Sequence, residues 1–243
     1  MFDFLGDILR LVIVLWPALL FCGVYLWWHY RNFRQSSYSS ATGNGFFRTI
    51  TDKGLYGEYL TYVILEACPG YKKILANVYV PKDDGTTTEV DVIMLHEAGI
   101  YVFESKNFSG WIFGRERDSQ WTQMLNKRTK KKFFNPIWQN KGHVAALQKV
   151  LVNKEVDPST FRAYIVFSER CDLKKVTVDS PDVWVLKRNE LRKQLKIDTQ
   201  ATSGAISRQT IHMFNEILAP YTHVDHATKD KHIANVRRKS IVR

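Results

Sequence analysis

The chain has 243 residues, 45% of them hydrophobic and 24% charged, which is enough for one good-sized core and typical of a globular protein. Its formal net charge of +11 favours polyanionic partners, either nucleic acid or anionic lipid, although a basic surface kept for solubility explains the charge equally well. The cysteines, Cys22, Cys68 and Cys171, show no paired spacing, which argues against a disulfide framework and fits a reducing cytosol.

The first element in the chain is an uncharged apolar stretch over residues 11–28, which residues 8 and 9 can extend. As a helix it would span roughly 27 Å, close to the thickness of the hydrocarbon core of a bilayer. Trp27, Trp28 and Tyr30 follow where an interfacial aromatic belt is expected. We predict a transmembrane helix at about 8–28 within an N-terminal anchor, 1–34.

A cleaved signal peptide is the main alternative for this segment. The start, MFDFLGD, is acidic rather than basic, and no small-x-small cleavage site directly follows the apolar run. Arg31, Arg34 and Arg48 follow the span, whereas only Arg10 and the amino terminus precede it. The positive-inside rule then predicts a single-pass membrane protein whose remaining domain is cytoplasmic.

After the anchor, residues 35–53 are rich in Ser, Thr and Gly and are predicted to be a linker. Helical spacing of apolar residues then predicts a helix that Pro69 and Gly70 end. Short β-prone runs follow, the last two joined through residues 96–99. The predicted helix is 53–68 and the predicted strands are 74–80, 89–95 and 100–106.

The second half continues with a short strand within residues 111–122 and a basic loop at 128–132. Asn135 is a good N-cap and Pro136 suits the first helical position, so a strong helix is expected from there. Further strands are predicted at 161–167 and 183–186, helices at 189–195 and 207–218, and a basic C-terminal tail at 221–243. The order α-β-β-β-α-β, with helices on a mixed sheet, indicates an α/β or α+β domain.

Acidic residues gather on the predicted hairpin. If the turn closes Leu95 on Ile100, Asp91 lies opposite Glu104 and Glu89 opposite Lys106, with directly opposed side chains about 5 Å apart. Two opposed carboxylates repel each other, and a divalent cation or a raised pKa would offset that cost. Oxygen ligands suit Mg²⁺ or Mn²⁺. An exposed strand face with an ordinary Glu89–Lys106 ion pair explains the spacing equally well.

The sequence resembles the nuclease-related domain (NERD) family of the PD-(D/E)xK, restriction-endonuclease-like superfamily. The matching blocks run in order from about residue 54 to residue 167. They are Gly57-Glu58, Thr88-Glu-Val-Asp91, the stretch Gly99-Ile-Tyr-Val-Phe-Glu-Ser-Lys-Asn-Phe-Ser-Gly110, and Asn135-Pro-Ile-Trp-Gln-Asn-Lys-Gly-His143. The resemblance implies a restriction-endonuclease-like core, here expected over 54–220.

The resemblance also implies roles for the matching residues. Asp91 and Glu104, with Glu58 from the first helix, would be ligands of Mg²⁺ or Mn²⁺. Lys106 would orient or activate the attacking water, and Gln139 would steady the site or the nucleic-acid backbone. Ser105, between Glu and Lys, should point to the opposite face of the sheet. His143 shares the helical face of Gln139, and a catalytic and a packing role are both open.

The implied reaction is phosphodiester hydrolysis of nucleic acid, with DNA as the expected substrate. The basic loop precedes the Gln139 helix and is expected to contact the nucleic-acid backbone. Its cations are Lys127, Arg128, Lys130, Lys131 and Lys132. Phe133, Phe134 and Trp138 suit either base stacking or the core. The alternative function is a catalytically inactive nuclease-fold module that binds nucleic acid or a protein at the membrane; oligomeric state is not predicted.

Overall fold

The computed structural model describes residues 4–151, 157–202, 204–222, 224 and 234. Most of the predicted basic tail, 221–243, lies outside the described residues. The helices are α1 (Phe4–Gln35), α2 (Tyr38–Thr42), α3 (Phe46–Thr51), α4 (Lys53–Glu66), α5 (Pro136–Leu151), α6 (Arg188–Ala201) and α7 (Arg208–Leu218), with short 3-10 turns at Pro158–Thr160 and Ala219–Tyr221. The strands are β1 (Lys72–Pro81), β2 (Thr87–His96), β3 (Gly99–Lys106), β4 (Gly110–Arg115), β5 (Gln120–Met124), β6 (Lys130–Phe134), β7 (Phe161–Phe167), β8 (Cys171–Thr177) and β9 (Val183–Lys187).

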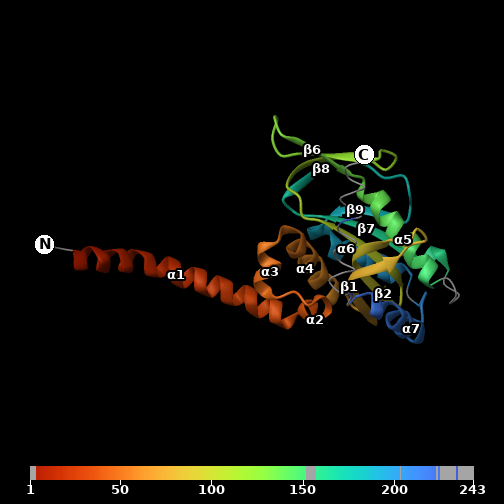
Figure 1. The fold of residues 1–243 in the computed structure, drawn as a ribbon, viewed down its shortest axis with the longest axis horizontal. Coiled ribbons are helices and arrows are strands. Elements are labelled where there is room, and N and C mark those ends of the chain that lie inside the picture. Colours follow the sequence, from red (N-terminus) through yellow and green to blue (C-terminus); the bar gives the residue numbers. More distant parts are fainter. Residues whose placement is uncertain (1–3, 152–156, 203, 223, 225–233, 235–243) are drawn as a thin grey trace.

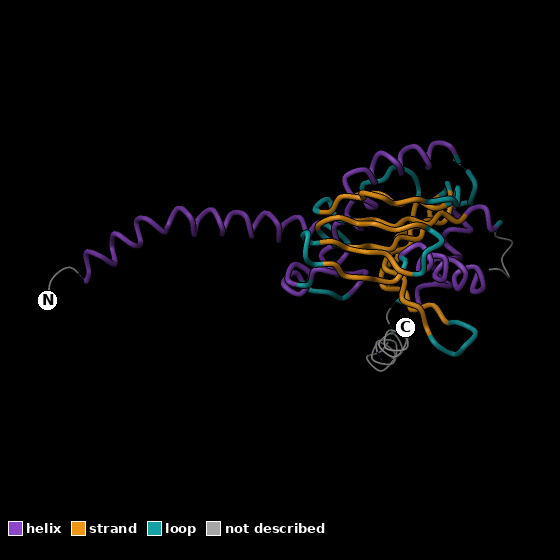
Figure 2. The backbone as a smooth tube through the Cα atoms, turned by 90° about the horizontal axis from the view of Figure 1, so that it is seen from above, coloured by secondary structure: helices purple, strands orange, loops and turns teal. Residues whose placement is uncertain are grey.

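A five-stranded sheet with the order β1-β2-β3-β7-β9 forms the centre of the domain. The first three strands are antiparallel, while β7 runs parallel to both β3 and β9. Aromatic residues of α4 and leucines of α6 pack on one face, and apolar residues of α5 and α7 pack on the other. Figure 2 shows this sheet with helices on both sides. The chain is therefore an α/β protein with a mixed sheet, and α4, β1, β2, β3, α5 and β7 follow in the predicted order.

A second sheet was largely missed by the sequence patterns. It has the order β6-β5-β4-β8 and is inserted mainly between β3 and α5. The predicted single strand in 111–122 is two strands, and the predicted basic loop at 128–132 overlaps strand β6, which begins at Lys130. Trp121 and Phe133 supply the buried face of this hairpin, but the run of basic residues hides the alternation. Figure 1 shows the hairpin at the edge of the domain.

The predicted linker, 35–53, is also wrong, because these residues form α2 and α3 and pack into the core. Phe33, Tyr38 and Phe46 are 2%, 0% and 8% exposed. The Phe33 ring of α1 contacts those of Tyr38 and Phe46, with centroids 6.2 and 5.6 Å apart. Phe33 and Tyr38 also contact Tyr59 of α4, with centroids 5.3 and 5.4 Å apart. Serine and threonine serve here as helix-end and turn residues, which is why the composition resembled that of a linker.

Helix α1 projects from the body of the protein (Figure 1). Its stretch Ile13–Gln35 is long and apolar enough to cross a membrane, and its large side chains from Ile13 to Tyr30 are mostly exposed. Towards its end the helix joins the domain, since Phe33 belongs to the α4-side core. The predicted boundary at residue 34 therefore cuts through a packed cluster rather than between two independent parts.

Candidate active site

The hairpin that carries the acidic residues has the register expected from its turn. Leu95 pairs with Ile100, and the ladder continues in the same register to Val92 and Phe103. The next positions along it are Asp91 and Glu104. The described ladder does not include this pair. Instead, the Ser105 N–H donates a hydrogen bond to Asp91 Oδ2 at 2.8 Å. This bond fixes the Asp91 carboxylate at the end of β3.

Strand β2 does not keep its alternation past Asp91. Val92 packs with α4, whereas Val90 packs in the cluster with α5. The opposing position in β1 is Asn77, which has a positive φ of 52°, and it is skipped in an otherwise regular register. Beyond this position the register resumes and pairs Tyr79 with Glu89, whose carboxylate accepts a hydrogen bond from the Tyr79 hydroxyl at 2.6 Å. The predicted opposition of Glu89 and Lys106 is therefore not part of the described ladder, which ends at Val92.

Lys106 lies at the centre of a side-chain network on the α5 side of the sheet. Its Nζ donates to Glu104 Oε1 at 2.5 Å and to Gln139 Oε1 at 3.1 Å. The other oxygen of Glu104 lies 3.0 Å from His143 Nε2, and His143 Nδ1 lies 2.8 Å from Thr88 Oγ1. Glu104 and His143 are 1% and 3% exposed. The structure therefore joins five side chains from β2, β3 and α5 in one polar network around the buried Glu104 and His143.

The start of α5 is anchored, which positions Gln139 and His143. Asn135 is fully buried and accepts the Ile137 N–H at 2.9 Å as the predicted N-cap. Its amide nitrogen also donates to the carbonyl oxygens of Glu116 and Asp118 at 2.8 and 2.7 Å. These bonds tie the helix to the turn between β4 and β5.

Glu58 approaches the same strand ends from α4 on the other side of the sheet. Gly57 allows this, because a Cβ there would lie 2.8 Å from Asn107 Cβ. Ser105 faces α4 as predicted, with its Oγ 3.3 Å from Thr61 Oγ1. Glu58 Oε2 is buried and has no hydrogen-bond partner. An unbonded buried carboxylate oxygen is costly, and a bound cation is one way to satisfy it.

The charges of the site act on one another. Burial, and then the negative charges of Glu89 and Glu104, raises the pKa of Glu58 to about 8. Burial and the charges of Glu104 and Glu58 raise the pKa of Asp91 well above its usual value. Burial alone would raise the pKa of Glu104, but Lys106 and the hydrogen bond with His143 outweigh it and lower that pKa. Burial likewise opposes the charge of Lys106, yet Glu104 and Asp91 raise its pKa, so the ammonium stays charged.

The donor set fits a hard divalent cation by type. Asp91, Glu104 and Glu58 offer carboxylate oxygens, the ligands that Mg²⁺ and Mn²⁺ prefer, and one of these oxygens is unbonded. Within the described residues, no three His, Cys, Asp or Glu side chains are already arranged to coordinate a metal. Glu104 instead uses its oxygens for Lys106 and His143. The residues thus supply suitable ligands without a preformed cage.

The five cations predicted to contact nucleic acid lie partly in a turn and partly on a strand. All five are exposed. Lys127 and Arg128 lie in the turn before β6, while Lys130, Lys131 and Lys132 alternate along that strand. Of the nearby aromatics, Phe133 packs into the core, whereas Trp138 is 41% exposed and donates from Nε1 to the Glu116 carbonyl at 2.7 Å.

Three contributing residues were not predicted. Thr88 bonds His143, and Asn140 donates to the carbonyls of Val102 at 2.9 Å and Tyr164 at 3.1 Å, which joins α5 to β3 and β7. Glu116 bonds Lys141 of α5 at 2.6 Å. Thr88 and Asn140 lie within the matching blocks of the sequence. Neither spacing nor charge indicates the role of any of the three, because each acts through a contact between distant segments.

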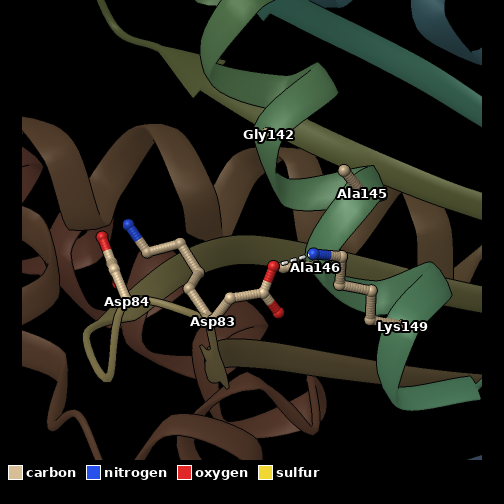
Figure 3. Close-up of a pocket in the computed structure, with 7 residues that line it drawn as sticks. Asp83, Asp84, Gly142, Ala145, Ala146 and Lys149 are labelled. Carbon is tan, nitrogen blue, oxygen red and sulfur yellow. Dashed lines mark hydrogen bonds and ion pairs between the residues drawn. The ribbon is translucent and has the colours of Figure 1, made fainter.

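A shallow hollow of about 280 Å³ lies beside α5, between it and the turn after β1. Figure 3 shows the Lys149 ammonium reaching the Asp83 carboxylate across it. The described residues that line it include none of the predicted catalytic residues. We interpret this hollow as the junction where the β1–β2 turn is held against the helix.

Comparison with known proteins identifies the family of this chain. Residues 53–168 match the nuclease-related domain (NERD). An uncharacterized protein of Bacillus anthracis is 33% identical over 190 residues, which cover 77% of this chain and 85% of that protein. The chain therefore belongs to the nuclease-related domain family, as the four sequence blocks indicated.

A solved structure with some likeness is the small subunit of the heterodimeric restriction endonuclease R.BspD6I. The alignment covers 84% of this chain and 96% of that chain, with 12% sequence identity and a TM-score of 0.29. A likeness this low supports no argument about function.

Proposed function

We propose that the protein is a membrane-anchored, metal-dependent nuclease that hydrolyses phosphodiester bonds of nucleic acid, with DNA as the substrate. The observation that carries this proposal is the placement of Lys106. Its ammonium is held by Glu104 and Gln139 at the end of β3. There it interacts with the charge of Asp91 on β2 and with that of Glu58 on α4, which has an unbonded buried oxygen. Membership of the nuclease-related domain family supports the reaction class.

In this proposal Asp91, Glu104 and Glu58 would hold Mg²⁺ or Mn²⁺, which would polarise the phosphate and lower the pKa of a water molecule. The Lys106 ammonium donates hydrogen bonds to the phosphate oxygens on which negative charge develops. Gln139 limits the freedom of Lys106, so the ammonium is already positioned before the substrate binds. The exposed cations before and along β6 attract the backbone of the substrate.

The proposed location follows from α1. Its apolar stretch is long enough to cross a bilayer once, and the excess of arginine after it favours a cytoplasmic domain. A single-pass anchor would keep the site within reach of the membrane surface, because the core residue Phe33 lies on the same helix.

The test uses the full chain in detergent with labelled single- and double-stranded DNA and RNA, in Mg²⁺, Mn²⁺ or EDTA. Lys106→Ala and Asp91→Asn are each expected to lower cleavage by at least about 100-fold, the usual cost of losing one group that stabilises charge in the transition state. Lys193→Ala, at an exposed position of α6, is the matched control.

Circular dichroism and the unfolding temperature of each variant show whether the fold is kept. Full, EDTA-sensitive cleavage by folded Lys106→Ala would refute the assignment of the site. Binding of nucleic acid without cleavage in any metal would instead favour the alternative, a catalytically inactive nuclease-fold module at the membrane.

A further inference from the structure

The second sheet has a face directed away from the core, which we call the outer face. Ile112, Trp121 and Phe133 pack inwards in one hydrophobic cluster. Because side chains alternate along a strand, the neighbours of Ile112, Trp111 and Phe113, point outwards. Trp111 is 37% exposed and Phe113 is half-buried. Aromatic residues therefore occupy the outer face in the middle strand of the β5-β4-β8 part of the sheet.

Strand pairing places lysines on both sides of these aromatics. Trp111 pairs with Met124, which pairs with Lys130. Phe113 pairs with Thr122, which pairs with Lys132, and on its other side Phe113 pairs with Lys175 of β8. The outer face thus has an aromatic row on β4, two lysines on β6 beyond β5, and a third lysine on the neighbouring β8.

A fourth lysine completes this arrangement. The Lys174 ammonium lies over the Trp111 ring, 6.0 Å from its centroid, at the bulge where β4 and β8 shift register. Its contact with Asp172 is long, at 3.8 Å, and its side chain is 51% exposed. Arg115, farther along β4, is instead neutralised by two hydrogen bonds to Asp118 at 2.9 and 3.1 Å. Positive charge therefore predominates beside Trp111 and Phe113, although Asp172, the β8 partner of Trp111, offsets part of it.

Two simpler explanations account for only part of this surface. Lysines on an edge strand hinder strand-to-strand aggregation, and β6 and β8 are both edges of the sheet. That explains the lysines but not an exposed tryptophan in β4, which lies between β5 and β8. Docking of a second copy would cover the aromatics, but it would bring two lysine-rich faces together, and like charges oppose such an interface.

We propose that the outer face binds single-stranded nucleic acid, with bases stacking on Trp111 and Phe113. Lys130, Lys132, Lys174 and Lys175 contact the phosphates on either side. Stacking needs unpaired bases, whereas a duplex offers its phosphates without exposed base faces, so the combination of rings and cations selects a single strand. The proposal rests on the proposed function only in taking nucleic acid as the partner.

The face is continuous with the candidate active site along the chain. Strand β4 begins at Gly110, shortly after Lys106, and Gly110 donates its N–H to the Arg170 carbonyl at 3.2 Å. A Cβ at Gly110 would lie 2.3 Å from the Met124 carbonyl oxygen, so only glycine allows the tight entry into β4. A single-stranded nucleic acid bound on the outer face would therefore contact β4, the strand that follows Lys106 in the chain.

The test measures binding of the full chain in detergent to fluorescent oligothymidylate of about 20 nucleotides in EDTA, where no cleavage occurs. Trp111→Ala is expected to weaken binding by about 5- to 100-fold, the usual range for the loss of one stacked base. Trp111→Phe should restore most of it. The double variant Lys130→Ala/Lys132→Ala should lower the salt dependence of log Kd by about 1.4, because each phosphate contact on a single strand contributes about 0.7.

The matched control for the lysines is Lys193→Ala/Lys196→Ala, which removes the same charge from the exposed side of α6. It is expected to change neither the affinity nor the salt dependence by a comparable amount. A duplex of the same length should be bound more weakly than the single strand and should respond much less to Trp111→Ala.

The proposal is overturned if Trp111→Ala leaves oligothymidylate binding unchanged, or if the control double variant weakens it as much as the β6 double variant. It is also overturned if the variants reduce binding to phosphatidylserine vesicles and leave oligothymidylate binding intact, since the partner would then be a lipid surface. Cleavage is scored separately. If the variants weaken oligothymidylate binding as expected but the protein cleaves no substrate, this inference holds and the proposed function fails. If the protein cleaves nucleic acid but the variants bind oligothymidylate as the wild type does, the proposed function holds and this inference fails.

Discussion

Glu116 provides a sharp test of how the second sheet is attached to the helix that carries Gln139. Its Oε1 accepts from Lys141 Nζ at 2.6 Å and from the Ser180 hydroxyl. Its Oε2 accepts the N–H groups of Asp179 and Ser180 at 2.6 and 2.9 Å. The residue is 8% exposed. One carboxylate thus joins the β4–β5 turn, α5 and the loop after β8.

The contribution of this carboxylate to the folding free energy follows from its pKa. Burial alone would raise it, but the hydrogen bonds from Lys141, Ser180 and Asp179 outweigh burial and lower the pKa of Glu116 from 4.5 to about 2. At 1.36 kcal/mol per pKa unit this shift corresponds to about 3 kcal/mol of folding free energy. Because the folded pKa is the lower one, this stability is present above pH about 4.5 and is lost as the pH falls towards about 2.

The perturbation is Glu116→Gln, and the assay is the unfolding temperature of the full chain in detergent between pH 7 and pH 2.5. At pH 7 the variant should melt roughly 6–12 °C below the wild type, since 1 kcal/mol shifts the midpoint by about 2–4 °C in a domain of this size. The difference should shrink steadily below pH 4.5, because the wild type loses its advantage as the carboxylate is protonated.

Asp83→Asn is the control, since the Asp83 carboxylate is 75% exposed and bonds only the exposed Lys149 among the described ion pairs. A surface pair of this kind contributes little, so its variant should follow the wild type at every pH. A gap between Glu116→Gln and the wild type that stays constant from pH 7 to pH 2.5 would refute the reasoning, because it would show that the carboxylate charge is not the source of the stability.

Further predictions concern the core, the support of Glu104 and the approach of α4. Phe33→Ala should lower the free energy of unfolding by about 3–5 kcal/mol, as for other buried phenylalanines. For the same reason, deletion of residues 1–34, which removes Phe33, should destabilise the domain, whereas deletion of residues 1–28 should not. Thermal melting of the purified proteins measures both effects. His143→Ala removes a hydrogen-bond partner of Glu104 and should weaken metal binding by about 10- to 100-fold, as calorimetric Mn²⁺ titration would detect, while secondary structure stays unchanged. Gly57→Ala should reduce cleavage far more than it reduces the unfolding temperature, because the new Cβ meets Asn107 while alanine favours the helix by up to about 1 kcal/mol. Equal losses of cleavage and thermal stability in Gly57→Ala would contradict a positioning role for this contact.

The β2–β3 hairpin shows how much of the structure local sequence patterns predict. Alternation and a short turn were enough to predict the register from Leu95 and Ile100 to the edge of the acidic residues. The same reasoning failed for Glu89, because the β2–β3 ladder ends at Val92 and Glu89 lies beyond the irregularity opposite Asn77. Such an irregularity depends on how two strands and their covering helices pack, which a periodic pattern within one strand does not contain.

The helices show the same difference between features that local residues predict and features that depend on tertiary packing. The N-cap Asn135 and the proline after it predicted the start of α5 correctly, since capping is a local interaction. The folding of residues 35–53 was not predicted, because polar serines and threonines dominate the composition while Tyr38 and Phe46 supply the burial. A few aromatic residues in a polar segment become informative only when their partners on α1 and α4 are known.

By itself, the sequence determined the family, the order of the core elements, the apolar α1 and the hairpin that carries Asp91, Glu104 and Lys106, because each depends on residues close together in the chain. Only the tertiary structure decided that Gln139 holds Lys106, that His143 holds Glu104, and that a second sheet exposes an aromatic face. These features join segments tens of residues apart. Their geometry is set by the packing of α4 and α5 on opposite faces of one sheet, which no local pattern encodes.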